Sequence, residues 1–251
     1  MALFFRILLV SPVILFWAIS STRADDAIIN KARGYLGSEA DLAVVRALRF
    51  RGELSVAEGK SLAPITAKLE IIFQQPDRQL IIATTPAKIE TTALNGYEAW
   101  QVEAVTDKKS TPRVSLLGRD SIKRLRANTF ENISFYRGIS SVGGRIEDRG
   151  KAKVDGVDCI KIAFIHASNV IFVRSFDRRT GRLILTETDN GSEIREYGEI
   201  RAGSLRFPQR IVTSSILPNG SKRIITITYN EITVNPKLPD TLFVIPSLAM
   251  P

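Results

Sequence analysis

Residues 170–191 of the chain read VIFVRSFDRRTGRLILTETDNG, which is two short apolar segments, each followed by a turn signal. The turns are DRRTG at 177–181 and DNG at 189–191, where glycine supplies the positive φ that tight turns require. Short segments rich in Val, Ile, Leu and Phe are typical of β-strands. Because connections this short can join only antiparallel neighbours, the stretch predicts an antiparallel sheet.

The same pattern extends over most of the chain. Further hairpin signals are Asn95-Gly96, Asp155-Gly156 and Asn219-Gly220, and a type I′ turn needs positive φ at both central positions. Segments of period two between such turns predict an antiparallel meander of about 10–11 strands. The expected strands are 50–58, 67–75, 78–84, 88–94, 97–105, 157–166, 170–176, 182–188, 193–201, 207–217 and 223–234.

Two segments have the apolar spacing of helices. Residues 26–49 form the first, which Gly37 interrupts and which Ser38 restarts as a candidate N-cap. Residues 116–136 form the second, in the middle of the chain. The sequence therefore predicts the α+β class: a single antiparallel meander with an N-terminal helix and a mid-chain helical insertion that is available as a lid.

Several predicted strands contain segments that are apolar on both faces. These segments are 69–73, 80–82, 171–173 and 183–185. A solvated antiparallel sheet shows clean alternation, so burial on both sides indicates a curled sheet that is packed on one face and encloses a hollow on the other. A filled core without a hollow explains the pattern equally well. The candidate lining residues for lipid are Ile71, Phe73, Ile82, Trp100, Phe172 and Leu185.

The first 24 residues resemble a cleavable export signal. Arg6 precedes an apolar run at 7–19, and small side chains at Thr22 and Ala24 precede the acidic start of the mature chain. An apolar core of this length fits the ~7–15 residues of a signal peptide and is shorter than the ~18 that span a bilayer. We therefore expect a signal peptide at 1–24 and one exported, soluble domain at 25–251, without a lipid anchor because the single cysteine is Cys159.

The residues offer no catalytic constellation. Cys159 and His166 are the only cysteine and histidine, and seven residues apart on one strand they point to opposite faces. No Gly-x-Ser-x-Gly motif, phosphate-binding loop or cluster of zinc ligands is present. We expect no enzyme activity, no metal and no cofactor. The carboxylate pairs that stay formally open are Glu187 with Asp189, Glu193 with Glu196, and Glu147 with Asp148.

The formal net charge is +9, with lysine and arginine spread along the whole chain. An exported basic protein can meet anionic lipid headgroups or acidic glycans, but a scattered solvated surface explains the charge more simply. The basic residues form no stripe with interleaved aromatic residues, so we expect no nucleic acid partner.

Five motifs are spread over residues 32–246. They are A-R-x-Y-L-G at 32–37, F-x-G-E-L at 50–54, D-G-V-D-C-I-K at 155–161, F-D-x-x-T-G-x-L at 176–183 and Y-N-E-I-x-V-N-x-x-L-P-D-x-L-F-x-I-P at 229–246. With the export signal, this set resembles the LolA/LolB-like group of periplasmic lipoprotein carriers and related outer-membrane lipoprotein-sorting proteins. The motifs are turns and a closing segment, so the resemblance concerns the fold.

The resemblance implies an unclosed β-barrel with helices in or over its mouth. It implies a monomeric, soluble periplasmic carrier, non-enzymatic, that holds acyl chains of lipoproteins or lipids and serves outer-membrane biogenesis as a chaperone. Its contacts would be with inner- and outer-membrane envelope proteins and only peripherally with the membrane. One alternative is an envelope binding or sensing module on the same fold that recognises a protein partner, and a more distant one is a secreted hydrolase.

Overall fold

The computed structural model describes residues 22–59, 64–106 and 111–246. In this part of the chain, 13 strands form one sheet in the order β6-β5-β4-β3-β2-β1-β15-β14-β11-β10-β9-β8-β7. They are β1 (Ala47–Glu58), β2 (Ile65–Gln74), β3 (Arg78–Thr84), β4 (Lys88–Asn95), β5 (Glu98–Val105), β6 (Arg113–Leu116), β7 (Arg145–Val154), β8 (Val157–Ile165), β9 (Ile171–Asp177), β10 (Leu183–Thr188), β11 (Glu193–Tyr197), β14 (Arg210–Ile216) and β15 (Lys222–Val234). Every pairing in it is antiparallel, which confirms the predicted sheet.

Short elements complete the fold. A separate two-stranded sheet is made by β12 (Ile200–Ala202) and β13 (Leu205–Phe207). The helical elements are α1 (Thr22–Leu36), α2 (Glu39–Ala43), α3 (Arg119–Ile133) and the 3-10 turns η1 (Ile139–Val142) and η2 (Asp240–Phe243).

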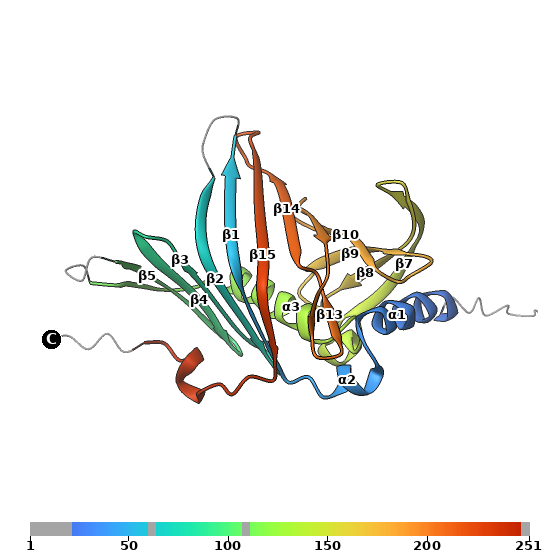
Figure 1. Ribbon diagram of the computed structural model, residues 1–251, viewed down its shortest axis with the longest axis horizontal. Helices are drawn as coiled ribbons and strands as arrows, with labels where there is room; N and C mark the ends of the chain where they lie inside the picture. Colours follow the sequence, from blue (N-terminus) through green and yellow to red (C-terminus); the bar gives the residue numbers. More distant parts are fainter. Residues whose placement is uncertain (1–21, 60–63, 107–110, 247–251) are drawn as a thin grey trace, which may run out of the picture.

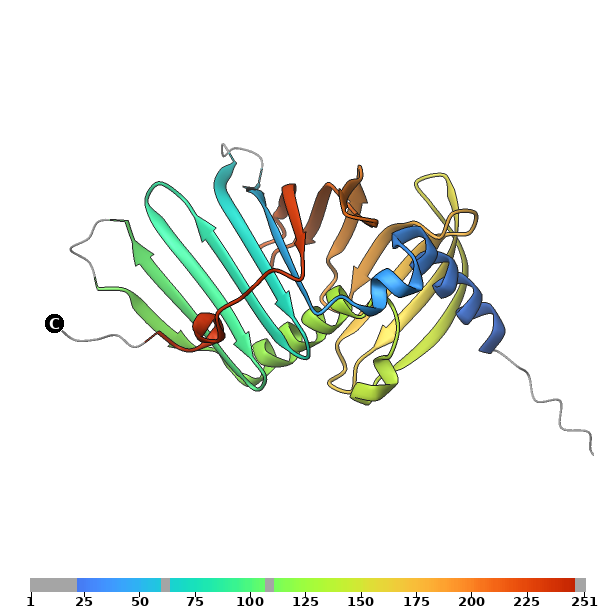
Figure 2. The same ribbon diagram turned by 60° about the horizontal axis from the view of Figure 1, so that its bottom comes forward.

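The order of the strands places α3 between the two edges of the sheet. The first strand, β1, pairs with the last, β15, in the middle of the sheet, and each half then runs outward as a meander. The edge strands β6 and β7 do not pair with each other, so hydrogen bonds do not close the sheet. The chain passes from β6 to β7 through α3, which lies across one face of the sheet, behind β15 in the view of Figure 1 (Figures 1 and 2).

The two faces of the sheet differ in polarity. We call the face against which α3 and α1 pack the inner face, and in the central strands it carries Phe50, Ile71 and Tyr229. The outer face of the same strands carries ion pairs, Arg49 with Glu70 among them. Since alternate residues of a strand point to opposite faces, the central strands show the alternation of a sheet that is covered on one side.

The C-terminal segment explains why the strands of one half are apolar on both faces. Phe243 of η2, 1% exposed, packs with Ile72, Leu80 and Trp100 on the outer face of β2–β5. The indole Nε1–H of Trp100 donates a hydrogen bond to the carbonyl oxygen of Phe243 at 3.1 Å. Here, therefore, the outer face is covered by the chain's own end.

The predicted helix bounds needed correction. The break at Gly37 and the N-cap at Ser38 are confirmed, because the Asp41 backbone N–H donates to Ser38 Oγ at 3.1 Å. The first helical region ends at Ala43 rather than at residue 49, since the chain from Ala47 onward pairs in the sheet. The second is shorter than 116–136, because Leu116 belongs to β6 and the chain after residue 133 leaves helical geometry.

The number of strands was also underestimated. The predicted 10 or 11 omit β6 and β7, which are the edges of the 13-stranded sheet. β7 has the sequence RIEDRGKAKV, in which six of the ten residues are charged, and its register is irregular between Asp148 and Lys151. Charges and bulges are usual on edge strands because they prevent pairing with other chains, and they conceal the strand from a search for apolar alternation.

Two hairpin turns illustrate what turn signals predict. Asn95 pairs with Glu98, so the loop is Gly96-Tyr97, and only Gly96 has a positive φ, of 64°. The predicted type I′ turn centred on Asn95-Gly96 is therefore wrong, although the hairpin is present. At the β7–β8 turn both Asp155 (48°) and Gly156 (84°) have positive φ, as a type I′ turn requires.

The proposed signal peptide lies almost wholly outside the described residues, and α1 begins at Thr22, before the expected cleavage site at Ala24. Among the helices that the structure describes, none combines the length and apolarity needed to cross a membrane.

Candidate functional site

The inner face has an apolar floor where α3 ends. Ile133 and Phe135, at the end of α3 and just after it, pack with Phe50, Ile71 and Phe73 from β1 and β2. Phe50 is also in edge-to-face contact with Phe207 of β13, with ring centroids 5.6 Å apart. This cluster fills the inner face near one end of the central strands.

Farther along the same strands, the inner face carries apolar side chains that no helix covers completely. Val56 of β1 lies opposite Ile65 of β2 on one side and Ile225 of β15 on the other. Leu54 of β1 lies opposite Ile227 of β15. Directly opposed residues point to the same face, so these side chains continue the inner face beyond the floor. We call this surface the apolar wall, which consists of Leu54, Val56, Ile65, Ile211, Ile225 and Ile227. Five of the six are half-buried, and Ile65 is 68% exposed.

A small cavity of about 90 Å³ opens between the floor and the wall. Its apolar lining comes from β1, β10, β14, β15, the end of α1, the segment after α3 and the β13 region. Its polar lining comes from Glu131 and Asn132 of α3, Arg174 of β9 and Glu196 of β11. The apolar lining residues are Leu36, Phe50, Phe135, Tyr136, Leu183, Phe207, Pro208, Ile211 and Tyr229.

A buried charged group connects α3 with β9 beside this cavity. The Glu131 side chain is 1% exposed; one carboxylate oxygen pairs with Arg174, and the other lies 2.7 Å from His166 Nε2. The Arg174 guanidinium also lies over the rings of Tyr136 and Phe164, 5.0 Å from each centroid. The pair is thus enclosed by aromatic rings and shielded from water, which makes its partners interdependent.

Glu196 differs from Glu131 in having no partner. Its carboxyl group is half-buried at the cavity and forms no hydrogen bond or ion pair with any other described residue. Burial raises the pKa of Glu196 to about 7, against the opposing influence of Arg174 and Arg182. Burial also raises the pKa of the hydroxyl groups of Tyr136 and Tyr229, and the nearby Glu196 charge adds to both shifts.

Charged contacts fasten α3 to both halves of the sheet. Arg126 pairs with Asp77 in the β2–β3 turn at 3.2 Å. On the other half, Arg124 forms a two-pronged contact with Asp189 in the β10–β11 turn, with both N–O distances 2.9 Å. Together with the Glu131 group, these contacts hold α3 across the opening.

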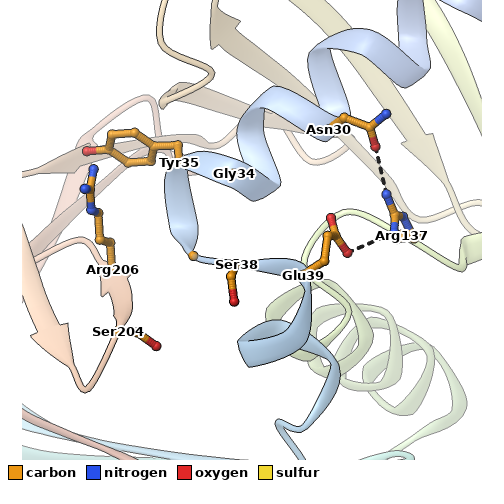
Figure 3. A pocket seen from close by; sticks show the side chains of 9 residues that line it. Asn30, Gly34, Tyr35, Ser38, Glu39, Arg137, Ser204 and Arg206 are labelled. Carbon is orange, nitrogen blue, oxygen red and sulfur yellow. Dashed lines mark hydrogen bonds and ion pairs between the residues drawn. The ribbon is translucent and has the colours of Figure 1, made fainter.

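A larger, polar pocket of about 560 Å³ lies where α1 meets α2 (Figure 3). Two of its charged groups pair with each other, because Arg137 donates to Glu39 at 3.0 Å and also to Asn30 at 2.8 Å, while Arg206 lies over the ring of Tyr35. The hydrogen bond from Arg33 is the main reason that the pKa of Glu39 is lowered. This pocket is therefore an open junction between helices, and most of its lining residues are polar residues or glycine.

The six candidate lining residues divide between the two faces. Ile71 and Phe73 lie in the floor, and Phe172 lies on the inner face with its ring edge-to-face with His166. Ile82 and Trp100 lie on the outer face under the C-terminal segment. Leu185 also faces outward, because its neighbour Thr186 belongs to the inner-face row. None of the six lines the cavity between floor and wall.

The other residues considered for chemistry are accounted for by local contacts. Cys159 is 1% exposed, and burial raises the pKa of its thiol, while His166 is bound to Glu131 elsewhere in the fold. Glu187 pairs with Lys161 at 2.5 Å, and Asp189 with Arg124. Glu193 pairs with Arg195, and Glu147 with Arg145 and Arg149. Within the described ranges, no three His, Cys, Asp or Glu side chains are grouped to hold a metal ion.

Sequence reasoning missed the residues that do line the cavity. Phe135 and Tyr136 have positive φ, 51° and 67°, which turns the chain after α3 and aims two aromatic residues at the sheet. Glu131 carried a weak signal, since it is an acid among apolar positions of a predicted helix. Glu196 was considered, but only as one of a pair with Glu193, which lies three residues away on the opposite face.

The open antiparallel sheet, with its helices on an apolar inner face, is the LolA-like fold. The chain is similar over 88% of its length to a LolA superfamily protein from Nitrosomonas europaea, covering 97% of that chain with 12% identity and a TM-score of 0.58. It is similar to a DUF1329 family protein from Desulfovibrio piger, with coverages of 87% and 96%, 12% identity and a TM-score of 0.56. A domain described as an outer-membrane lipoprotein-sorting protein, from Vibrio parahaemolyticus, gives 88% and 97%, 10% identity and 0.55.

At sequence level, no family model and no curated protein matches the chain. The similarity to solved structures therefore establishes the fold and leaves the ligand to be argued from the site.

Proposed function

We propose that this protein is a non-enzymatic carrier in the periplasm that holds acyl chains of lipoproteins or lipids against the inner face of its sheet. The observation that carries the proposal is the apolar wall, an incompletely covered row of isoleucine, leucine and valine side chains next to the cavity. Burying an acyl chain there would gain about 0.8 kcal/mol per methylene group. The related fold of a lipoprotein-sorting domain supports the same reading.

The size of the cavity bears on how a chain would be held. Small-molecule sites usually measure roughly 300–1,000 Å³. The cavity between floor and wall has only about 90 Å³, so a bound acyl chain must extend along the apolar wall or the helices must move. The expected cleavage of the signal peptide after Ala24 is part of this proposal, because a carrier that is released from one membrane can move to another.

Exchange of Ile225 for glutamate tests the wall directly. Ile225 lies on the inner face between Val56 and Thr213, and a charge there would have to be buried under a bound chain. We expect Ile225→Glu to weaken binding of a fluorescent fatty acid by about tenfold or more, measured by titration of the protein lacking residues 1–24.

Thr226→Glu is the matched control, because Thr226 is the next residue of β15 and faces outward between Ser55 and Val212. It should bind the probe as the unchanged protein does. If the unchanged protein binds no probe and carries no lipid after purification, the carrier function is wrong. If both variants lose the same amount of affinity for the probe, the apolar wall is not part of the binding site.

We further propose that the N-terminal helix, rather than the mid-chain helix, acts as the lid. α1 lies over one half of the inner face through Ile28, Ile29 and Ala32, and its last residue, Leu36, lines the cavity. Gly37 separates it from α2. α3, by contrast, is fastened to turns of both halves.

Hydrogen exchange distinguishes the two helices. Loading with the fatty acid should change the protection of amides in Thr22–Leu36 and leave that of Arg119–Ile133 within error. A change confined to α3 would reverse the assignment, and equal protection of both helices with and without ligand would exclude a helical lid.

A further inference from the structure

Several polar side chains at the cavity can donate a hydrogen bond, among them those of Tyr136, Arg174 and Tyr229. The hydroxyl groups of Tyr136 and Tyr229 form no hydrogen bond with any described residue, although the two side chains are only 9% and 6% exposed. Arg174 is equally buried, and its Nε–H has no acceptor. Both oxygens of Glu131 are already occupied by Arg174 and His166.

Glu196 completes this set. It lines the same cavity as Tyr136, Arg174 and Tyr229, so these groups lie near one another. When protonated it is a further donor. Arg174 Nε–H is buried without an acceptor, which costs free energy, whereas the two tyrosine hydroxyls belong to residues that line the cavity and can bond an acceptor that a ligand supplies.

We propose that the cavity is a subsite for the carbonyl oxygen of an ester- or amide-linked acyl chain, whose hydrocarbon then follows the apolar wall. A carbonyl oxygen is a neutral acceptor with two lone pairs, and it joins the chain to its polar head at the point where the floor meets the wall. This inference rests on the proposed carrier function and adds which end of the ligand the cavity recognises.

Three ligands with twelve-carbon chains test the subsite by displacing a fluorescent fatty acid. They are monolauroylglycerol, which has an ester carbonyl, N-lauroylethanolamine, which has an amide carbonyl, and 1-O-dodecylglycerol, an ether without a carbonyl. One recovered hydrogen bond predicts that a carbonyl ligand binds roughly fivefold more tightly than the ether. Tighter binding of either carbonyl ligand than of the ether is an advantage that supports the subsite. The ligand that binds more tightly identifies the preferred linkage of the acyl chain, which is a lipid-like ester or a lipoprotein-like amide.

The variant Tyr136→Phe/Tyr229→Phe should bind the carbonyl ligands no more tightly than the ether, and its affinity for the ether should equal that of the unchanged protein. Both rings are retained, so the contacts of Tyr136 with Phe176 and of Tyr229 with Phe50, each 5.0 Å between centroids, remain. Tyr97→Phe, at a side chain that is 77% exposed, is the control and should keep the advantage.

Glu196 makes the advantage depend on pH. Below pH 7 the protonated carboxyl donates to the carbonyl oxygen, and above pH 7 the carboxylate repels it, so the advantage should fall between pH 6 and pH 8. Glu196→Gln, whose amide donates at either pH, should retain it. The titratable and charged groups that face Glu196 or line the same spaces are Tyr35, Glu131, Tyr136, Arg174, Arg182, Arg206 and Tyr229.

Two failures are distinguishable. If ester, amide and ether bind with equal affinity, the subsite is refuted and the carrier function stands. If none of the three displaces the probe and the probe itself does not bind, the carrier function fails and the subsite with it.

Discussion

Replacing Glu131 with leucine is expected to lower the free energy of unfolding by about 3–5 kcal/mol. Glu131 is the only carboxylate in direct contact with Arg174 among the described residues, and both side chains are at least nine-tenths buried. Removing it leaves the guanidinium charge enclosed by Tyr136 and Phe164 without compensation, and it takes the partner from His166. Denaturation in urea, followed by circular dichroism, measures the loss.

The double variant Glu131→Leu/Arg174→Leu separates the buried charge from the lost volume. Removing both members of a buried pair is often nearly neutral, so the double variant should be more stable than Glu131→Leu alone. Asp189→Ala, which breaks the exposed pair of α3 with the β10–β11 turn, should cost at most about 1 kcal/mol. A loss in Glu131→Leu no greater than in Asp189→Ala would show that the buried pair does not hold α3.

Replacing Gly52 with alanine is expected to cost about 3 kcal/mol or more, or to prevent folding. A Cβ atom on Gly52 would lie 2.0 Å from the carbonyl oxygen of Thr228 and 2.9 Å from Tyr229 Cα. The register between β1 and β15 shifts at Arg51/Gly52, where the two backbones come together in the middle of the sheet. Because the obstruction is backbone in two central strands, no side-chain rotation relieves it.

Gly34→Ala provides the matched control. Gly34 lies inside α1, and nothing is found within 4 Å of the Cβ that alanine would add. Alanine is preferred to glycine in a helix by about 1 kcal/mol, so this variant should be as stable as the unchanged protein or slightly more so. The thermal unfolding midpoints of the two variants test this prediction. A midpoint of Gly52→Ala equal to that of Gly34→Ala would rule out the close approach of the two backbones at the bulge.

The features that could be predicted from the sequence are those that short-range chemistry governs. Ser38 follows a glycine and precedes acidic residues, and it caps α2 as such a residue does elsewhere. Asp155-Gly156 turns the chain because both residues accept positive φ. Short connections between apolar strands require antiparallel neighbours, and so the class of sheet followed from the spacing of turns.

The prediction of which strand residues line the inner face was wrong where a segment distant in the sequence covers the outer face. Trp100 and Ile82 are as apolar as Ile71, but the C-terminal segment packs over them on the outer face. Nothing within β3 or β5 indicates that residues some 140 positions later will lie there. A strand's period of two tells which residues share a face, without telling which of the two faces is the inner one.

The sequence alone thus determined the antiparallel sheet, its hairpins, the broken N-terminal helix and the residues that alternate along each strand, since each depends on neighbours a few positions away. Only the tertiary structure decided that β1 and β15 meet, that α3 crosses between the edges β6 and β7, and that Glu131, Arg174, Glu196, Tyr136 and Tyr229 gather at one cavity. The physical reason is that these residues come from three different strands, a helix and the segment that follows it, and long-range packing, not local preference, brings them together.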